Sequence, residues 1–129
     1  MSTKFYGEGN IGSIPEFREF PRDNEKPRTL LKLNVYFDNP VPVKDGYDDR
    51  GGYWAPVEWW HENAEHWSML FQKGMRVHVD GRTVRDTWEN EEGPQSTFKI
   101  EARSVAILPY RIERVILSPK PSEPPSREE

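Results

Sequence analysis

The chain has 129 residues, of which 34% are apolar and 31% charged, and this predicts a single domain with one compact core. The absence of cysteine excludes disulfide bonds and thiolate metal sites. A net charge of −4 excludes a generally basic nucleic-acid binder, so a polyanion would have to be held by a local arrangement of cations. The N-terminal MSTKFYGEGN has no apolar signal region and no apolar run approaches about 18 residues, which predicts a cytoplasmic protein without membrane spans.

The first predicted strand lies in residues 5–11, FYGEGNI, whose two glycines indicate a bend. Residues 15–27 are polar and turn-rich. The next strand, residues 28–37, alternates between two faces. Its predicted core face carries Leu31, Leu33, Val35 and Phe37, and its other face carries Leu30, Lys32, Asn34 and Tyr36. Residues 38–52 contain many Pro, Gly and Asp residues, which predicts a long loop or flexible hairpin.

The segment YWAPVEWW, residues 53–60, alternates in the same way. One face carries Ala55, Val57 and Trp59, and the other carries Trp54, Pro56, Glu58 and Trp60. Because neighbouring strand residues point to opposite faces, Trp59 and Trp60 cannot both lie in the core. We therefore expect Trp59 to be buried, together with the later Trp67, and Trp60 to face outward.

A short helix is predicted next, because apolar residues recur at helical spacing before Gly74. Its predicted buried residues are Ala64, Trp67, Leu70 and Phe71. The following strand begins with inward Met75, Val77 and Val79, bends at a bulge at Gly81 and then carries Arg82, Val84, Asp86 and Trp88 on one side. The last long strand covers residues 96–108 and changes its apolar phase at 102–104. RIERVIL, residues 111–117, predicts a further short strand.

This order predicts a mainly β protein: a five-stranded OB-fold barrel with one short helix between its third and fourth strands. A small β-sandwich is the alternative architecture. The domain is expected to cover residues 1–117. Residues 118–129, SPKPSEPPSREE, are rich in Pro and Ser, which predicts a disordered tail.

Three segments share a pattern with a known family: GNIGSIPEFREF at 9–20, VEWWHENAEHWSMLFQKGMRVHVDGRTVRDTWENEEG at 57–93, and FKIEARSVAIL at 98–108. Together they resemble the bacterial single-stranded DNA-binding proteins. That family has G-N-hydrophobic-G followed by P-E-x-R, and K-G-x-x-V-x-V-x-G-x followed by an aromatic residue and an acidic turn. The resemblance implies an OB-fold whose exposed aromatic rings stack on bases, and a homo-oligomer, specifically a tetramer.

The positions that match the stacking residues of this family are Trp54, Trp60 and Trp88, and Tyr36 is a weaker candidate on the same face. An exposed indole stacks on any base, at about 1–3 kcal/mol per base, so binding would not depend on sequence. The candidate phosphate contacts are Arg18, Arg22, Lys32, Lys73, Arg76, Arg82 and Arg85. Alternatives remain for each residue: a subunit interface for Trp60, cross-strand packing for Trp54 and Trp88, and a solvated surface charge for any one cation.

The chain also departs from the family pattern. Val84 and Asp86 stand where basic residues are often found, and the insertion at 38–53 is acidic. The end, PSEPPSREE, lacks the terminal hydrophobic residue of the family's partner-recruiting tail. These departures predict a divergent member. An origin in a plasmid or integrated mobile element is one interpretation of them.

A catalytic function is not predicted. HENAEH at 61–66 is similar to the zinc motif H-E-x-x-H, but its histidines are five residues apart, which places them about 140° apart around a helix. We therefore predict a non-catalytic protein that needs no cofactor or metal. It would bind single-stranded DNA in the cytoplasm, at the nucleoid, during replication, recombination, repair or DNA transfer, alongside DNA-processing proteins. The alternative is an OB-fold module that binds RNA or a protein through the same aromatic surface.

Overall fold

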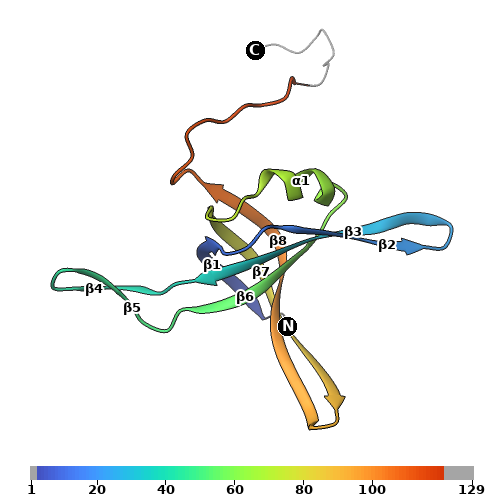
Figure 1. The fold of residues 1–129 in the computed structure, drawn as a ribbon, viewed down its shortest axis with the longest axis horizontal. Helices are drawn as coiled ribbons and strands as arrows, with labels where there is room; N and C mark the ends of the chain where they lie inside the picture. The colour runs from blue at the N-terminus through green and yellow to red at the C-terminus, as the bar shows by residue number, and fades with distance from the viewer. Residues whose placement is uncertain (1–2, 121–129) are drawn as a thin grey trace.

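A computed structural model describes residues 3–120 of the chain (Figure 1). Within this range the structure contains β-strands and a short helix between the sixth and seventh of them. The elements are β1 (Lys4–Ile11), β2 (Glu16–Arg22), β3 (Glu25–Phe37), β4 (Pro40–Val43), β5 (Gly46–Asp49), β6 (Tyr53–Trp60), α1 (Ala64–Leu70), β7 (Arg76–Asn90) and β8 (Gly93–Leu108). No helix in the described range reaches the length and apolar character that crossing a lipid bilayer requires.

Five strands pair in a ring, in the order β1-β7-β8-β6-β3, and β3 pairs again with β1. All of these pairings are antiparallel except that between β6 and β8. The parallel pairing is short and joins only Val57 to Ile100 and Glu58 to Glu101. A ring of this order, with one helix between its third and fourth strands, is the arrangement predicted from the sequence, so the OB-fold is confirmed.

The core follows the predicted alternation. The buried side chains include Leu31, Leu33, Val35 and Phe37 from β3, Ala55, Val57 and Trp59 from β6, and Val77 and Val79 from β7. The phase change in β8 is also present, since Ile100 and Val105 are both buried. A register shift between Asp80 and Gly81 marks the predicted bulge. Leu30 was assigned to the outer face but is buried; its partner in the register of β3 and β6 is the large residue Trp60.

Helix α1 closes one end of the barrel with Ala64, and Phe71 just after the helix is buried beside it. Trp67 packs on the core, and its ring centroid lies 4.4 Å from that of Trp59, so both tryptophans are core residues as predicted. Leu70 was predicted to be buried but is exposed. The helix ends at Leu70, and the chain turns into extended backbone at Phe71, so a continued helical spacing does not apply there.

Three hairpins extend from the barrel, as Figure 1 shows: β2–β3, β4–β5 and the distal part of β7–β8. The first corrects the sequence analysis, because residues 15–27 contain strand β2 and the start of β3. Their polarity reflects exposure on both sides of the hairpin. Asn24 has a φ of 58° between the two strands, a conformation that Asn tolerates better than most residues.

The predicted strand at residues 111–117 is wrong. Leu108 pairs with Arg76, the first residue of β7, so no partner strand remains beyond it. The chain instead makes a turn in which the amide of Ile112 donates to the carbonyl of Pro109 at 3.1 Å. Residues 115–117 are exposed. The predicted disordered tail falls largely on residues 121–129, which lie outside the described residues.

Candidate nucleic-acid interface

Trp54 lies on the outer face of β6, and 56% of its surface is exposed. Its neighbour across the strand pair is Tyr36 of β3, with ring centroids 5.3 Å apart. The indole reaches over β3 to the end of β1, where a Cβ on Gly12 would lie 2.2 Å from Trp54 Cζ3. A side chain at position 12 would therefore displace the ring. The second glycine of the GNIG motif keeps this part of the outer surface flat and leaves the Trp54 ring accessible.

Tyr36 is tied to the β4–β5 hairpin. Its hydroxyl donates a short hydrogen bond to the carboxylate of Asp49, which raises the pKa of Tyr36 and lowers the pKa of Asp49. The same carboxylate accepts the backbone amide of Asn39 at 2.8 Å. Tyr36 therefore orients the hairpin and supports Trp54. Its predicted base contact remains a prediction.

An apolar cleft of about 410 Å³ opens where β6 and β8 separate. Trp54 and Pro56 of β6 line one side, and Phe98 and Ile100 of β8 line the other. Phe98 is 58% exposed, although it lies on the face of β8 that carries buried Ile100 further along the strand. The cleft therefore presents aromatic rings from two strands, and the sequence analysis did not identify Phe98 as part of it.

Trp88 lies on the extended part of the β7–β8 hairpin, opposite Gln95, and is 49% exposed as predicted. Between Trp88 and Trp54, Lys99 forms ion pairs with Glu58 at 3.1 Å and with Asp86 at 3.2 Å. Burial lowers the pKa of Lys99, but the hydrogen bonds to these two carboxylates outweigh it and raise the pKa above its ordinary value. The acidic residue noted as a departure from the family is thus held by a lysine, and Lys99 itself is already paired with two carboxylates.

Trp60 is half-buried at the other end of β6, where the β2–β3 hairpin passes over it. The guanidinium carbon of Arg28 lies 4.0 Å from the centroid of the Trp60 ring, and the ring of Phe20 lies 5.4 Å away. Such a cation–π contact orients the arginine over the ring. Within residues 3–120, Arg28 has no ion pair with a carboxylate, so its charge is available to a phosphate.

Two hollows flank Trp60. One of about 710 Å³ is lined by Lys4, Arg82 and Arg103 among others, and one of about 320 Å³ by Arg22, Lys26 and Arg28. The acidic residues in the two linings are Asp80, Glu101 and Glu62. The surroundings of Trp60 are therefore locally basic in a chain with a net charge of −4. This is the kind of local arrangement that a polyanion would need.

Three of the predicted cations are exposed and each forms one ion pair: Arg18 with Glu16, Arg22 with Glu25, and Arg82 with Glu101, at 2.8 to 2.9 Å. Exposed pairs of this kind contribute about 0–1 kcal/mol, so a phosphate can replace the carboxylate at little cost. The pair with Arg18 also lowers the pKa of Glu16.

Arg76 has a different environment, and the structure gives it a structural role. Its side chain is only 18% exposed and pairs with Glu8 at 2.8 Å and with Asp38 at 2.9 Å. It also donates to Asn10 Oδ1 at 2.6 Å. This network joins β1 and β7 to the chain after β3 and lowers the pKa of Glu8, chiefly through the hydrogen bond from Arg76. A phosphate would have to displace two carboxylates to reach it.

The remaining predicted cations are dispersed. Lys32 lies on the outer face of β3, opposite Glu16 on one side and Glu58 on the other. Arg85 lies near Phe98, with its guanidinium carbon 5.9 Å from the ring centroid. Lys73 lies in the turn before β7, at the end of the barrel opposite the β7–β8 hairpin tip, and is not part of the aromatic surface.

Sequence reasoning missed Arg28, Arg103 and Phe98. Arg28 was assigned to the very start of a strand, and only the hairpin register places it beside Trp60. Phe98 carries the alternation of a core residue, and it is exposed only because β8 has separated from β6 at that point. Neither the position of Arg28 beside Trp60 nor the exposure of Phe98 has a signal in the local sequence. The nearest signal that the sequence offers is an arginine at the start of the strand that precedes the tryptophan-rich segment 53–60.

The HENAEH segment does not lie on a single helix. α1 begins at Ala64, so His61 precedes the helix, and its ring stacks on Trp67 with centroids 4.2 Å apart. Its Nδ1 accepts the amide of Asn63 at 3.0 Å. Among residues 3–120, no group of three or more His, Asp and Glu side chains is arranged to hold a metal ion.

A five-stranded OB barrel with exposed aromatic rings and nearby cations on its outer surface defines a protein of the single-strand nucleic-acid-binding class. The sequence pattern of the single-strand binding protein family matches residues 3–108, and the chain belongs to this family.

Curated relatives carry the same family name. The chain is 26% identical over 109 residues to a single-stranded DNA-binding protein of Thermus aquaticus. The matched region covers 80% of this chain but only 38% of that protein. It is 25% identical over 108 residues to a single-stranded DNA-binding protein of Aquifex aeolicus (strain VF5), covering 84% of this chain and 71% of that one. The chain thus spans well under half of the first relative's length.

Solved structures support the fold. The small single-stranded DNA-binding protein of Streptomyces coelicolor superposes with a TM-score of 0.71 at 19% identity, over 86% of this chain and 98% of that one. A Plasmodium falciparum protein of the same kind, solved in complex with single-stranded DNA, superposes with a TM-score of 0.64 at 14% identity, over 84% and 96% of the two chains.

Proposed function

We propose that this protein binds single-stranded DNA without sequence preference. Bases would stack on Trp54, Trp60 and Trp88, and nearby cations would contact the phosphates. One observation supports this most strongly: large aromatic rings lie exposed on the outer surface of the barrel and its β7–β8 hairpin, where a core does not need them. Membership of the single-strand binding protein family favours DNA over the alternative of RNA or a protein partner.

The energetics are adequate for this function. Each stacked base contributes about 1–3 kcal/mol, so the three indoles supply several kcal/mol without base-specific hydrogen bonds. Phosphate contacts would be concentrated around Trp60, where Arg28 forms no ion pair with any residue of the described range 3–120 and the pair of Arg82 is exchangeable. The acidic β4–β5 hairpin lies at the other end of β6 from Trp60, and Glu58, two residues from Trp60 on the same face, is paired with Lys99. The net charge therefore does not prevent binding.

Binding of this kind protects exposed strands and removes hairpins, because it stabilises only the unpaired state. It would serve replication, recombination, repair or DNA transfer, together with DNA-processing proteins, in the cytoplasm at the nucleoid.

The protein would act without catalysis, and as a homo-oligomer. The support for the oligomer is the family resemblance to tetrameric members. Light scattering at several protein concentrations would measure the mass, and a monomer at every concentration would contradict the oligomer.

The function is tested by intrinsic tryptophan fluorescence during titration with an oligo-dT strand, at low and at moderate salt. We expect deep quenching, because bases that stack on exposed indoles quench them, and weaker binding at moderate salt, because counterions are released on binding. The same titration with a duplex of equal length is the control, since paired bases cannot stack on the protein. Absence of quenching by the single strand at both salt concentrations would contradict the proposal.

A further inference from the structure

The cleft between β6 and β8 exists because these two strands pair at only two positions. Val57 pairs with Ile100 and Glu58 with Glu101, and no other pairing joins the two strands within residues 3–120. The strands run parallel toward these pairs, and before them β8 extends from the barrel in its hairpin with β7 (Figure 1). The strand edges that face each other across the cleft therefore lack ladder partners, and their backbone groups are available to a ligand.

The β7–β8 hairpin carries an aromatic ring on each of its two faces. Trp88 pairs with Gln95, and Phe98, three residues after Gln95, lies on the opposite face of β8 together with Ile100. Ile100 is buried in the core, whereas Phe98 is 58% exposed beside the cleft. Phe98 therefore offers a stacking surface on the face of the hairpin that Trp88 does not reach.

A cation accompanies the Phe98 ring. Arg85 of β7 pairs with Phe98 across the hairpin, and its guanidinium carbon lies 5.9 Å from the ring centroid. Arg85 donates to Ser96 Oγ at 3.3 Å, and among residues 3–120 it forms no ion pair with a carboxylate. Trp60 and Arg28 form a similar combination of a ring and a guanidinium on the barrel. A guanidinium beside a stacking ring is placed to contact the phosphate of a nucleotide whose base lies on that ring.

The size and chemistry of the cleft suit a single nucleobase. Its volume of about 410 Å³ is near the lower end of the range of about 300–1,000 Å³ that small-molecule sites occupy. The rings of Trp54 and Phe98 line it from two different strands, and none of the lining residues described in the range 3–120 is charged. Hydroxyl groups in the lining come from Tyr53, Thr83 and Thr97. A planar ring with hydrogen-bonding groups along its edge matches aromatic walls combined with hydroxyls and unpaired strand edges.

We propose that one base of the bound DNA strand enters this cleft between Trp54 and Phe98, with its phosphate on Arg85. The inference rests on the proposed function and adds to it a base subsite that the tryptophans alone do not form. Trp54 lies on the outer face of β6 and also lines the cleft, so the subsite is continuous with the outer aromatic surface. The bound strand would thus contact both faces of the β7–β8 hairpin, through Trp88 on one face and Phe98 on the other.

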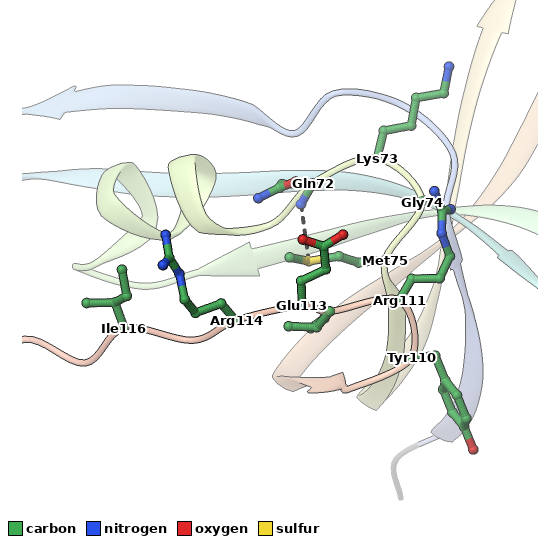
Figure 2. A pocket seen from close by; sticks show the side chains of 10 residues that line it. Gln72, Lys73, Gly74, Met75, Tyr110, Arg111, Glu113, Arg114 and Ile116 are labelled. Atoms are coloured by element: carbon green, nitrogen blue, oxygen red, sulfur yellow. Dashed lines mark hydrogen bonds between the residues drawn. The ribbon is translucent and has the colours of Figure 1, made fainter.

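The first test compares Phe98→Ala with Tyr110→Ala in the full chain. Tyr110 is also an exposed ring, at 66%, but it follows β8 at the other end of the barrel, and Figure 2 shows it directed away from the turn before β7. Anisotropy measures the affinity for a labelled oligo-dT of about 16 nucleotides, the upper site size of one OB-fold. Phe98→Ala should bind about 5- to 150-fold more weakly, the loss of one stacked base. Tyr110→Ala should bind as the unaltered protein does, and Phe98→Tyr, which keeps the ring, should retain most of the affinity.

A pair of double variants tests whether two rings hold the same base. In W54A/F98A the loss of affinity should be smaller than the product of the two single losses, because removal of either ring already releases the base from the cleft. In W88A/F98A the single losses should multiply, since the rings lie on opposite faces and contact different bases. Multiplied losses in W54A/F98A would overturn the shared base. Melting curves verify that every variant folds.

The phosphate contact is tested by Arg85→Gln, with Lys44→Gln in the turn between β4 and β5 as its control. The slope of log K against log salt should fall by about 0.7 in Arg85→Gln, the contribution of one phosphate contact of a single strand. Lys44→Gln should leave the slope unchanged, and an equal change in both variants would overturn the contact at Arg85.

The outcomes separate this inference from the proposed function. If the unaltered protein does not bind oligo-dT, the proposed function itself fails. If it binds and Phe98→Ala binds equally tightly, only the cleft subsite is overturned. If Phe98→Ala keeps its DNA affinity but has a smaller mass in light scattering, the cleft is an interface between copies of the chain and the subsite is likewise overturned.

Discussion

The adjacent tryptophans of β6 provide the most direct test of the relation between this structure and its proposed function. Trp59 is 9% exposed and packs against Trp67 and Phe71, whereas Trp60 lies on the opposite face beneath Arg28. We therefore expect Trp59→Ala to reduce stability and Trp60→Ala to reduce DNA affinity. The two substitutions remove the same side chain from neighbouring positions, so each is the matched control for the other.

The magnitudes follow from burial and stacking. Truncation of a buried tryptophan to alanine costs about 3–5 kcal/mol, which lowers the melting temperature by about 10–20 °C for a domain of this size. Trp60→Ala should cost about 1 kcal/mol or less in stability, because the ring is half-exposed. It should lose a stacking platform of about 1–3 kcal/mol, which is roughly a 5- to 150-fold weaker affinity.

Circular dichroism melting measures the first effect. Anisotropy of a labelled oligo-dT measures the second, and it does not depend on the protein's own fluorescence. Trp60→Phe should recover part of the lost affinity, since it restores a ring on the outer face. The reasoning is refuted if Trp60→Ala melts as early as Trp59→Ala, or if it binds DNA as tightly as the unaltered protein.

Three further predictions concern the support of the site. Gly12→Ala should weaken DNA binding toward the level of Trp54→Ala in the same anisotropy assay, because the new Cβ would lie 2.2 Å from the Trp54 ring; unchanged affinity would show that the ring position is not needed. Arg28→Ala should lower both affinity and its salt dependence, by about 0.7 in the slope if one phosphate contact is lost. Its control is Lys44→Ala, which removes one exposed charge from the turn between β4 and β5, and an equal change in both would assign the effect to net charge. The pKa of Glu8 is lowered in the folded protein, so its contribution to folding stability is complete above pH 4.5, the ordinary pKa of a glutamate. This contribution is lost as the pH falls through the lowered pKa. Urea unfolding of Glu8→Gln should therefore show a smaller loss of stability on acidification, and an unchanged acid profile would exclude this role.

The period-2 alternation of β3, β6 and β7 was sufficient to assign the core and to place Trp54, Trp60 and Trp88 outside it, because a strand divides its residues between two faces regardless of its partners. The bulge at Gly81 and the core position of Trp59 followed from the same local rules. Polar composition hid strand β2, because a hairpin exposed on both faces has no apolar alternation to reveal it.

Only the tertiary structure determined which charges are available. Arg76 and Arg28 are both arginines at strand positions, yet Arg76 is held by two carboxylates from distant segments, while Arg28 lies over an indole and pairs with no carboxylate among residues 3–120. The exposure of Phe98 likewise depends on the point where β6 and β8 separate. Side-chain alternation is a property of one strand and can be read along it. Ion pairs and clefts depend on which strands become neighbours and in which register, and these are decided only when the barrel closes.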